Sequence, residues 1–551
     1  MVMVRFPARI GIAAVFVCLA LNGLSPSPAS AAAPGRSTTP GAAAATGRSQ
    51  LVYGGPDGKL QYKPDANGNT IPDFSNCGYR GGGVAIRDLP VRVTVFPISE
   101  PTDDTPRLQK AIDEVSGLPV GSDGFRGAVL LKRGTYRVPG TLKISASGVV
   151  LRGEGDGETG TLLVAAGAKE RDLIEVAGAS AAKENEKDRR AITDEYVPVG
   201  ARSFTVADAK GLKVGDSVIV RRVGNAAWIS FIGMDKIKGR PGNEDSTKQW
   251  TPFDLPFDRV ITVIDGNKIT VDAPIACAIE QKWGGGTIAR YDEKGRIENC
   301  GVERIRAMSE FDKSVTQKQD GKEYAADEKH AKYMIHFENV RNAWARNVTT
   351  LHFYHGPSSI GRGAKWVTVQ DSRSLEPVSV ITGGRRYPFA FEGELSLYLR
   401  CYSSKARHAF VVSSHVCGPN AFVDCVSEEN YATSEPHHRW SVGGLYDNVK
   451  ADMAFQDRQW MGSGHGWAGA NYLAWNCEGS LVCQQPPTAQ NWAIGFVGKK
   501  ERGAFERPEG FWESLGKHVQ PRSLYMKQLE DRLGAQAVQN VSRGQHEEAS
   551  R

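Results

Sequence analysis

LSLYLRC (Leu395–Cys401), AFVDCV (Ala421–Val426) and YLAWNC (Tyr472–Cys477) decide the fold that we predict for this chain. Each is a short apolar run of strand type that ends at or beside a cysteine. Cys401 and Cys425 are 24 residues apart. This interval suits one turn of a solenoid, and the chain around these runs shows no amphipathic helices of the kind that βαβ folds require. We therefore predict an all-β fold made of repeated coils.

An N-terminal segment indicates which solenoid this is. Asp103-Asp104-Thr105 is typical of a helix N-cap, and Leu108, Ala111, Ile112 and Val115 form an apolar stripe over the next residues. The following strand-like runs are GAVLLKRGTYRV (Gly127–Val138), GTLKI (Gly140–Ile144) and SGVVLRGEG (Ser147–Gly155). This order resembles the start of pectate-lyase-superfamily proteins. The resemblance implies a right-handed parallel β-helix whose helix caps one end of the coils.

Residues 197–276 interrupt the repeat. Their alternating runs, with a hairpin signal at Asp265–Asn267, predict a small antiparallel β insert. We predict a β-helix domain over 51–540, a terminal helix over Leu524–Leu533 that covers the last coil, and a disordered tail over 541–551. The aromatic residues of the insert suit either a wall that stacks on sugars or the insert's own core. They are Trp228, Trp250, Phe253 and Phe257.

The N-terminus has the pattern of a secretion signal. Arg5 and Arg9 precede the apolar run Ile10–Leu21, and Ala29–Ala31 offers a cleavage site near Ala31. We expect a signal peptide over 1–31, a flexible linker over 32–50, and a secreted, extracellular and monomeric protein without a membrane span. A net charge of +6, spread along 551 residues, argues against nucleic acid and suits an anionic polysaccharide partner.

Eight cysteines remain after the predicted signal peptide. An even number in an exported chain permits disulfides. Cys401, Cys425 and Cys477 each follow a strand-like run, however, so equivalent places in a stacked repeat would make them a ladder of buried thiols. The sequence leaves both interpretations open. No CxxC pair is present, which argues against a structural zinc site.

A polar segment between Asp65 and Asp73 carries oxygen side chains at alternating positions. Asp65, Asn67, Asn69 and Asp73 have the spacing of a calcium loop, although the usual terminal Glu is missing. The same pattern is typical of an Asn/Gly turn. Ca²⁺ is therefore a candidate cofactor, and nothing in the sequence indicates an organic one.

The candidate active site lies where basic side chains gather in the middle and C-terminal coils. Five of the 11 histidines fall between His408 and His465, and intervals of 23 residues separate Arg385 from His408 and His415 from His438. Residues that are one coil apart in sequence lie on adjacent strands, which are about 4.8 Å apart. The candidate catalytic residues are Arg385, Arg386, Tyr387, Lys405, Arg407, His408, His415, His438, Arg439 and His465. The candidate substrate-binding residues are Asn420, His437, Trp440, Trp467 and Asn471.

These residue types suit β-elimination on a uronate. The reaction needs a cation to neutralise the carboxylate, a base to remove the α-proton and an acid for the leaving oxygen. The arginines suit the first role, Tyr387 the last, and His408, His415, His438 or Lys405 the second. We predict a secreted polysaccharide lyase. The alternatives are a hydrolase of the polygalacturonase type, which would need clustered aspartates, and a non-catalytic carbohydrate-binding β-helix.

Overall fold

The computed structural model describes residues 47–100 and 102–542. The predicted signal peptide, most of the predicted linker and most of the predicted tail lie outside these ranges. Within them, no helix is long and apolar enough to cross a membrane.

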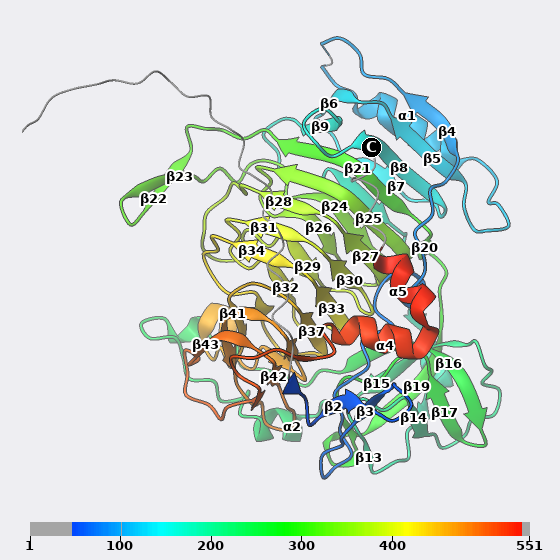
Figure 1. Ribbon diagram of the computed structural model, residues 1–551, viewed down its shortest axis with the longest axis vertical. Coiled ribbons are helices and arrows are strands. Elements are labelled where there is room, and N and C mark those ends of the chain that lie inside the picture. Colours follow the sequence, from blue (N-terminus) through cyan, green and yellow to red (C-terminus); the bar gives the residue numbers. More distant parts are fainter. Residues whose placement is uncertain (1–46, 101, 543–551) are drawn as a thin grey trace, which may run out of the picture. The chain divides into compact units, whose positions relative to one another are not determined.

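Three parallel sheets run along a stack of coils, and each coil contributes a strand to them in turn (Figure 1). The first sheet contains β4 (Val91–Val95), β5 (Gly127–Leu131), β8 (Val149–Gly155), β21 (Gly301–Ser309), β25 (Val340–Leu351), β27 (Lys365–Gln370), β30 (Leu397–Leu399), β33 (Asn420–Val423), β37 (Gly444–Asp447), β40 (Leu473–Trp475), β42 (Trp492–Ile494) and β44 (Phe511–Glu513). This is the predicted parallel β-helix.

The other two sheets are shorter. The second contains β6 (Gly134–Val138), β9 (Thr161–Ala165), the second halves of β21 and β25, β28 (Arg373–Leu375), β31 (Tyr402–Ser404) and β34 (Val426–Glu428). The third contains β7 (Leu142–Ile144), β10 (Ile174–Ala177), β24 (Tyr333–Glu338), β26 (Gly356–Ile360), β29 (Phe389–Phe391), β32 (Phe410–Val412) and β35 (Glu435–Pro436). Near the C-terminal end, β38 (Met453–Phe455) pairs with β41 (Glu478–Cys483), which pairs with β43 (Val497–Glu501).

One left-handed residue makes the corner between the first and second sheets in successive coils. Asp371, Arg400, Asp424, Asn448 and Asn476 occupy this corner with φ between 50° and 54°. Strand register places each directly above the next. Asn and Asp tolerate this conformation better than most residues, which explains why they recur at the ends of the apolar runs.

The residue after each corner points into the core. Cys401 and Cys425 are neighbours in this column, and Val449 separates them from Cys477. All eight cysteines of the described chain are buried and free. The ladder interpretation is therefore confirmed, and the disulfide alternative is wrong for these residues.

The capping helix α1 (Thr105–Ser116) contacts β4, β5, β7 and β8 at one end of the stack (Figure 1). Its buried residues are Leu108, Ala111, Ile112 and Val115, the predicted stripe. Helix α4 (Leu524–Leu533) has the predicted bounds but a different place. It packs on the outer face of the first sheet, against Leu397, Val423 and Trp475, because those side chains would otherwise expose apolar surface. Helix α5 (Ala535–Ser542) follows it, so the predicted tail begins helically.

The antiparallel insert leaves the coils after β10 and returns before β21. Its main strands run from β11 (Lys183–Glu184) to β19 (Gly286–Asp292), so it is longer than the predicted 197–276. Its other strands are β12 (Arg190–Ala191), β13 (Tyr196–Val197), β14 (Ser203–Thr205), β15 (Ser217–Arg222), β16 (Leu255–Asp265), β17 (Lys268–Val271) and β18 (Ile279–Glu280), and its α-helix is α2 (Ala226–Phe231). Asp265 pairs with Lys268 around a two-residue turn, as the hairpin signal predicted.

The insert folds back onto later coils. Its apolar core includes Trp440, Trp467 and Val442 from the β-helix beside Trp228, Trp250 and Phe257. The rings of Trp228 and Trp440 meet edge to face, with centroids 5.0 Å apart. The core interpretation of the insert's aromatic residues is confirmed for Trp228, Trp250 and Phe257. Through this contact the insert comes to border the coils that carry the candidate site.

Candidate active site

A cluster of polar side chains forms around the starts of strands β29 and β32 and the short strand β35 in the third sheet. We call Tyr387, His408, Glu435, His437, His438, Arg458 and His465 the histidine cluster. Phe389 pairs with Phe410, so Tyr387 and His408, each two residues earlier, lie on neighbouring coils. Their ring centroids are 5.1 Å apart. Glu435 and His437 are two residues apart in extended chain and therefore share a face.

His437 links the interior of the cluster to its surface. Its Nε2 lies 3.2 Å from the Tyr387 hydroxyl, and its Nδ1 lies 3.0 Å from Glu435 Oε1. Arg407 Nη1 donates to the same Tyr387 oxygen at 3.0 Å. Tyr387 is half-buried, whereas Glu435 is 1% exposed and His437 is 9% exposed. The half-buried phenol of Tyr387 is thus in contact with a buried imidazole, which in turn contacts a buried carboxylate.

Arg458 fixes the tautomer of His437. Its Nη1 lies 2.6 Å from Glu435 Oε1 and 2.6 Å from His437 Nδ1. A guanidinium N–H can only donate, whereas the Glu435 oxygen, 3.0 Å from the same Nδ1, can only accept. Because the contact with Arg458 is the shorter of the two, we place the lone pair of Nδ1 towards the guanidinium. We therefore assign the proton of His437 to Nε2, which then donates to the Tyr387 hydroxyl. Tyr387 in turn donates to the Gly383 carbonyl at 3.2 Å.

His438 and His465 form the solvent-reaching side of the cluster. Their ring centroids are 4.9 Å apart, and each lies within 5.3 Å of His437. Both rings are half-buried, and Nδ1 of each is buried without a hydrogen-bond partner in the described chain. Buried polar atoms without partners are rare in folded proteins and often mark functional positions. Beside them, Arg439 donates to the Ser463 carbonyl and hydroxyl.

The GSGHGW motif positions His465 by letting backbone pass close to other atoms. Gly462 has φ +61°, and a Cβ there would lie 2.0 Å from the His465 ring. Gly464 has φ +83°, and a Cβ there would lie 2.4 Å from the Lys248 carbonyl of the insert. The glycines are needed for this packing.

The insert supplies one wall beside the cluster. Phe253 stacks on His415 with ring centroids 4.0 Å apart. Trp250 Nε1 donates to the Gly464 carbonyl at 3.1 Å, and Arg240 donates to the Gly462 carbonyl at 3.0 Å. The segment 461–465, which contains the short helix α3 (Met461–Gly464) and His465, is therefore held by two hydrogen bonds from the insert. Phe253 remains half-exposed, so of the four aromatic residues it is the one that can still meet a ligand.

Burial keeps the histidines neutral. It lowers the pKa of His438 to about 4, with further lowering by Arg439 and Arg458. It lowers the pKa of His415 to about 4 and of His465 to about 2, and it places the pKa of His408 and His437 well below the usual value. Burial raises the pKa of Tyr387 to about 12, although Arg407 opposes the shift. The cluster therefore combines neutral imidazoles and a neutral phenol with permanently charged arginines.

Six predicted catalytic residues lie outside the histidine cluster. Arg407, His415 and Arg439 border it, whereas the other three are engaged by other parts of the protein. Arg386 is 3% exposed and donates to the Ser379, Ala325 and Lys405 carbonyls, so it cannot hold a substrate carboxylate. Arg385 forms a bidentate ion pair with Glu328. Lys405 lies near Glu376, with Nζ 3.4 Å from Oε1. His408 joins the cluster but is 2% exposed, so it supports the site without meeting substrate.

Four predicted substrate-binding residues are buried and are corrected to structural roles. Asn420 accepts from the Ser396 amide and donates to the Gly393 carbonyl. Asn471 donates to the Ala276 carbonyl of the insert at 2.9 Å. Trp440 and Trp467 belong to the insert core, at 0% and 2% exposure. The fifth, His437, lies at the centre of the cluster.

The predicted calcium loop does not fit that ion. Asp65 Oδ1 accepts from the amides of Asn67 and Asn69, which is the arrangement of an Asx turn. Asn69 Oδ1 accepts from Tyr196 and Val199, and Asp73 pairs with Arg202. The oxygens turn towards different donors of the protein instead of towards one centre. The turn interpretation accounts for this segment.

Another group does have a ligand-like arrangement. His408, Glu435 and His437 each offer one atom, and the three atoms lie within 4.8 Å of one another. Among the residues described, this is the arrangement of three His, Cys, Asp or Glu side chains that suits a metal ion. Arg458, however, already places a cation against two of the three.

The aspartates that were candidates for a hydrolase mechanism form structural contacts away from the histidine cluster. Asp371 forms a bidentate pair with Arg400, and Asp424 pairs with Arg522. Asp447 is fully buried and accepts from Ser523 and the Tyr525 amide at the start of α4. All three lie at or beside the corner of the first sheet, towards α4 and α5. None belongs to the histidine cluster.

Sequence reasoning missed Glu435 and Arg458. Glu435 stood in the EPHHRW motif (Glu435–Trp440), and its spacing of two from His437 was the signal for a shared face. Arg458 lies one coil later, where no motif marks it. Thr433, whose hydroxyl donates to Glu435 Oε2 at 2.9 Å, carried no signal either.

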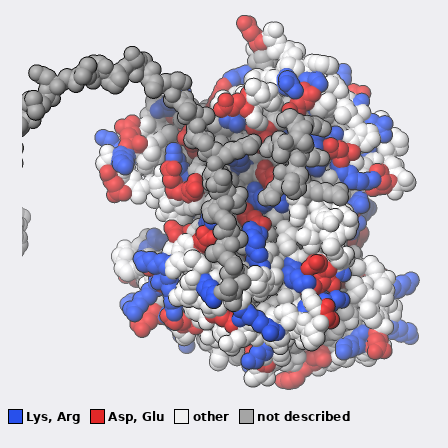
Figure 2. Space-filling model, viewed as in Figure 1, with Lys and Arg blue, Asp and Glu red and all other residues white. Residues whose placement is uncertain are grey.

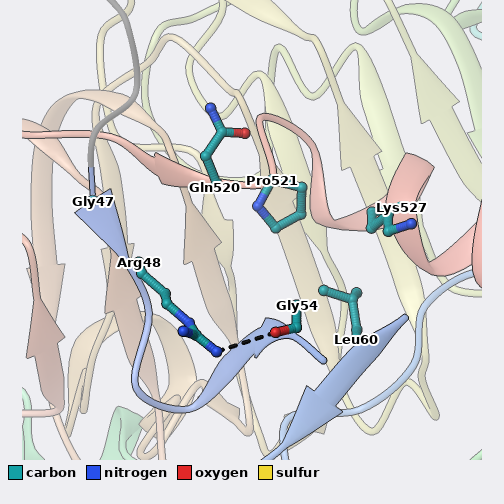
Figure 3. A pocket seen from close by; sticks show the side chains of 7 residues that line it. All are labelled: Gly47, Arg48, Gly54, Leu60, Gln520, Pro521 and Lys527. Carbon is teal, nitrogen blue, oxygen red and sulfur yellow. Dashed lines mark hydrogen bonds between the residues drawn. The ribbon is translucent and has the colours of Figure 1, made fainter. Parts of the chain in front are cut away.

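The histidine cluster does not coincide with the cavity in Figure 3. That cavity, of about 400 Å³, is lined by Gly47, Arg48, Gly54, Leu60, Gln520, Pro521 and Lys527. It offers neither a histidine nor a carboxylate, and its one lysine, Lys527, is paired with Glu530 and Asp531. On the face shown in Figure 2, positive and negative side chains are interspersed, without the continuous basic surface that nucleic acid requires.

Comparison with known proteins adds structural neighbours only. No family model and no curated protein matches the chain. The tailspike protein gp49 of Pseudomonas phage LKA1 has 13% identity and a TM-score of 0.43, covering 72% of this chain and 57% of that chain. The alginate lyase from Paenibacillus sp. str. FPU-7 has 8% identity and a TM-score of 0.35, covering 77% and 98%.

The A-module of the mannuronan C-5 epimerase AlgE4 from Azotobacter vinelandii has 10% identity and a TM-score of 0.29, covering 79% and 95%. The present chain thus spans just over half the length of the tailspike. These similarities concern the fold.

Proposed function

We propose that the protein is an exported enzyme that cleaves a uronic-acid-containing polysaccharide by β-elimination at the histidine cluster. One observation carries this proposal. The groups that reach solvent in the cluster are a phenol and neutral imidazoles, the guanidinium ions of Arg407 and Arg439 lie beside them, and the carboxylate, Glu435, is buried against Arg458. Elimination needs a cation, a base and an acid, and the cluster has side chains of each kind.

Tyr387 is proposed as the acid. Its hydroxyl reaches solvent and accepts from both Arg407 and, in the assigned tautomer, His437. When Tyr387 gives its proton to the leaving oxygen, a tyrosinate forms. The same two donors then stabilise its negative charge at the moment at which it develops. A neutral phenol with a pKa of about 12 is present in the donating form at neutral pH.

His438 is proposed as the base. It is neutral because burial lowers its pKa, and it is the predicted base that combines partial exposure with a place beside His437. Arg439 and Arg407 would hold the substrate carboxylate, because guanidinium forks match carboxylates geometrically. This charge neutralisation acidifies the proton next to the carboxylate.

The steps balance without a further reactant. His438 takes the C5 proton of the uronate, the electron pair forms the C4=C5 double bond, and the C4–O bond breaks. Tyr387 protonates the departing oxygen. The imidazolium and the tyrosinate then exchange a proton through solvent, which restores the resting site.

A hydrolase would need two carboxyl groups on opposite sides of the bond that breaks. Glu435 is the one carboxyl group in the histidine cluster, and Arg458 and Thr433 occupy its oxygens. The cluster therefore favours elimination over hydrolysis.

The decisive experiment follows ultraviolet absorbance while purified protein is mixed with a panel of uronate polysaccharides. Rising absorbance from the conjugated unsaturated uronate is the expected result. New reducing ends without this absorbance would show hydrolysis. Binding without either signal, measured by affinity electrophoresis, would show a carbohydrate-binding protein and would contradict the proposed reaction.

A further inference from the structure

Arg458 places a guanidinium nitrogen against two of the three residues of ligand type in the histidine cluster. Its Nη1 contacts Glu435 Oε1 and His437 Nδ1 at the same distance, 2.6 Å, and also lies 2.8 Å from the His437 carbonyl. His408 is the third residue of the ligand type, and its Nδ1 lies 3.4 Å from Glu435 Oε1. This Nδ1 also donates to the Thr433 carbonyl, a hydrogen bond that a metal ion would have to displace. Two imidazoles and a carboxylate form a ligand set typical of zinc sites.

The guanidinium is held there by burial. The Arg458 side chain is 9% exposed and that of Glu435 is 2% exposed. A buried carboxylate requires a partner of opposite charge, since an uncompensated charge in the interior is strongly unfavourable. Glu435 therefore needs a cation at this place, and the chain supplies it from β-helix residues one coil later.

We propose that Arg458 is a built-in substitute for a metal ion, which occupies the cation position of the His408–Glu435–His437 ligand set. Arg458 does the two things that a metal would do there. It compensates the charge of Glu435, and it engages His437 Nδ1 so that Nε2–H points at Tyr387. Arg458 is thus a positioning residue that acts through His437. This second role rests on the proposed function, whereas the occupancy of the cation position does not.

The test removes the guanidinium and asks whether a metal takes its place. The probes are Zn²⁺ and Co²⁺, added as the metal alone to wild type and to Arg458→Ala. In the variant we expect Tm to rise with metal concentration, and Co²⁺ to develop visible absorption bands of a site with nitrogen and oxygen ligands. In wild type neither change is expected, because Arg458 fills the position. No substrate is needed, so the result is independent of the proposed reaction.

Two further variants make the result specific. Arg458→Ala combined with His408→Ala should lose the metal-dependent rise in Tm, because one ligand is missing. Arg458→Lys keeps the charge and should show no response to metal. Its kcat on a uronate substrate should fall with KM unchanged, because an ammonium group does not reproduce the contact with His437 Nδ1. A substitution that only perturbed the fold would instead change Tm without lowering kcat at unchanged KM.

Several outcomes would overturn the proposal. The first is a folded Arg458→Ala protein whose Tm and absorption do not change with either metal. The second is a wild type that shows the same rise in Tm. The third is a metal-dependent rise in Tm that persists when His408 is also replaced. An Arg458→Ala protein that is unfolded both with and without metal would also contradict it. If the variant folds only when metal is present, the proposal is supported, because the metal then replaces the missing cation.

Discussion

Two groups of buried charges in this protein have similar ingredients and different surroundings. The first, which we call the insert cluster, consists of Asp258 and Tyr291 from the insert, Arg296 from its return to the coils, and Lys365 from β27. Asp258 lies 2.7 Å from Lys365 Nζ and 2.9 Å from Arg296 Nη1. In the histidine cluster, Glu435 lies 2.6 Å from Arg458 and 3.0 Å from His437.

The difference lies in what covers each carboxylate. The side chains of the charged members of the insert cluster are at most 4% exposed, and they join elements that are distant in sequence. Its contacts hold the insert against the coils. Glu435 is equally buried, but its contacts lead through His437 to Tyr387 at the surface. The same pairing of buried charges thus secures a domain contact in one place and orients a surface hydroxyl in the other.

The largest expected effect separates the two clusters by stability. Asp258→Ala leaves Lys365 and Arg296 buried without their partner, and we expect the free energy of unfolding to fall by about 3–5 kcal/mol. Denaturant unfolding measures it. The control Asp245→Ala, at an exposed position of the insert, should change the free energy by less than about 0.5 kcal/mol. Equal effects in the two variants would contradict the structural role of the insert cluster.

Tyr387→Phe tests the other side of the comparison. Removing the hydroxyl should lower kcat on a uronate polysaccharide by about a hundredfold, because the leaving oxygen loses its acid, while Tm stays near that of wild type. The matched control is Tyr402→Phe, which removes a hydroxyl that donates to Glu428 at 2.8 Å on the second sheet. Loss of activity in both variants, or in neither, would remove Tyr387 from the mechanism.

The two clusters should also titrate in different pH ranges. His438 has a folded pKa of about 4 against an ordinary 6.5, so the unfolded chain binds more protons between these values. Its contribution to stability is complete above about pH 6.5 and is lost as pH falls through about 4. Burial alone would raise the pKa of Asp258, but Lys365 and Arg296 lower it from 3.8 to about 2, so its contribution is lost only below pH 3.8.

Unfolding free energies measured across this range check the prediction. In wild type the free energy should decline from about pH 6.5 downwards, and His438→Gln should make this decline shallower. The rate of elimination should also fall as pH approaches 4, because the base becomes protonated. A decline that begins only below pH 3.8 would contradict the neutral, buried state of the cluster histidines.

The smallest expected effect concerns the wall that the insert provides. Phe253→Ala removes the ring that stacks on His415, and we expect KM to rise by a few-fold, equivalent to about 0.5–1.5 kcal/mol. The control is Phe231→Ala, because Phe231 is 61% exposed on the same insert and packs on Trp283 instead. An unchanged KM in the Phe253 variant would show that the insert does not contact substrate.

The coil architecture could be predicted because each coil repeats a local rule. An apolar run, an Asn, Asp or Arg in left-handed conformation and a buried small residue recur at intervals close to one turn, as Leu399, Arg400 and Cys401 illustrate. Residues one coil apart are neighbours, so the sequence could predict that Tyr387 and His408 lie close together. The direction in which Arg386 or Asn420 points could not, because a shift of one residue exchanges inside for outside.

The sequence by itself determined the parallel β-helix, its capping helix, the bounds of α4, the presence of an insert and the region of the histidines. Only the tertiary structure decided where α4 packs, that Trp440 and Trp467 belong to the insert core, and that Glu435 and Arg458 complete the candidate site. The physical reason is that strands and coils follow from local periodicity. Contacts between the insert and later coils, and between Arg458 and Glu435, join residues whose separation in sequence carries no period.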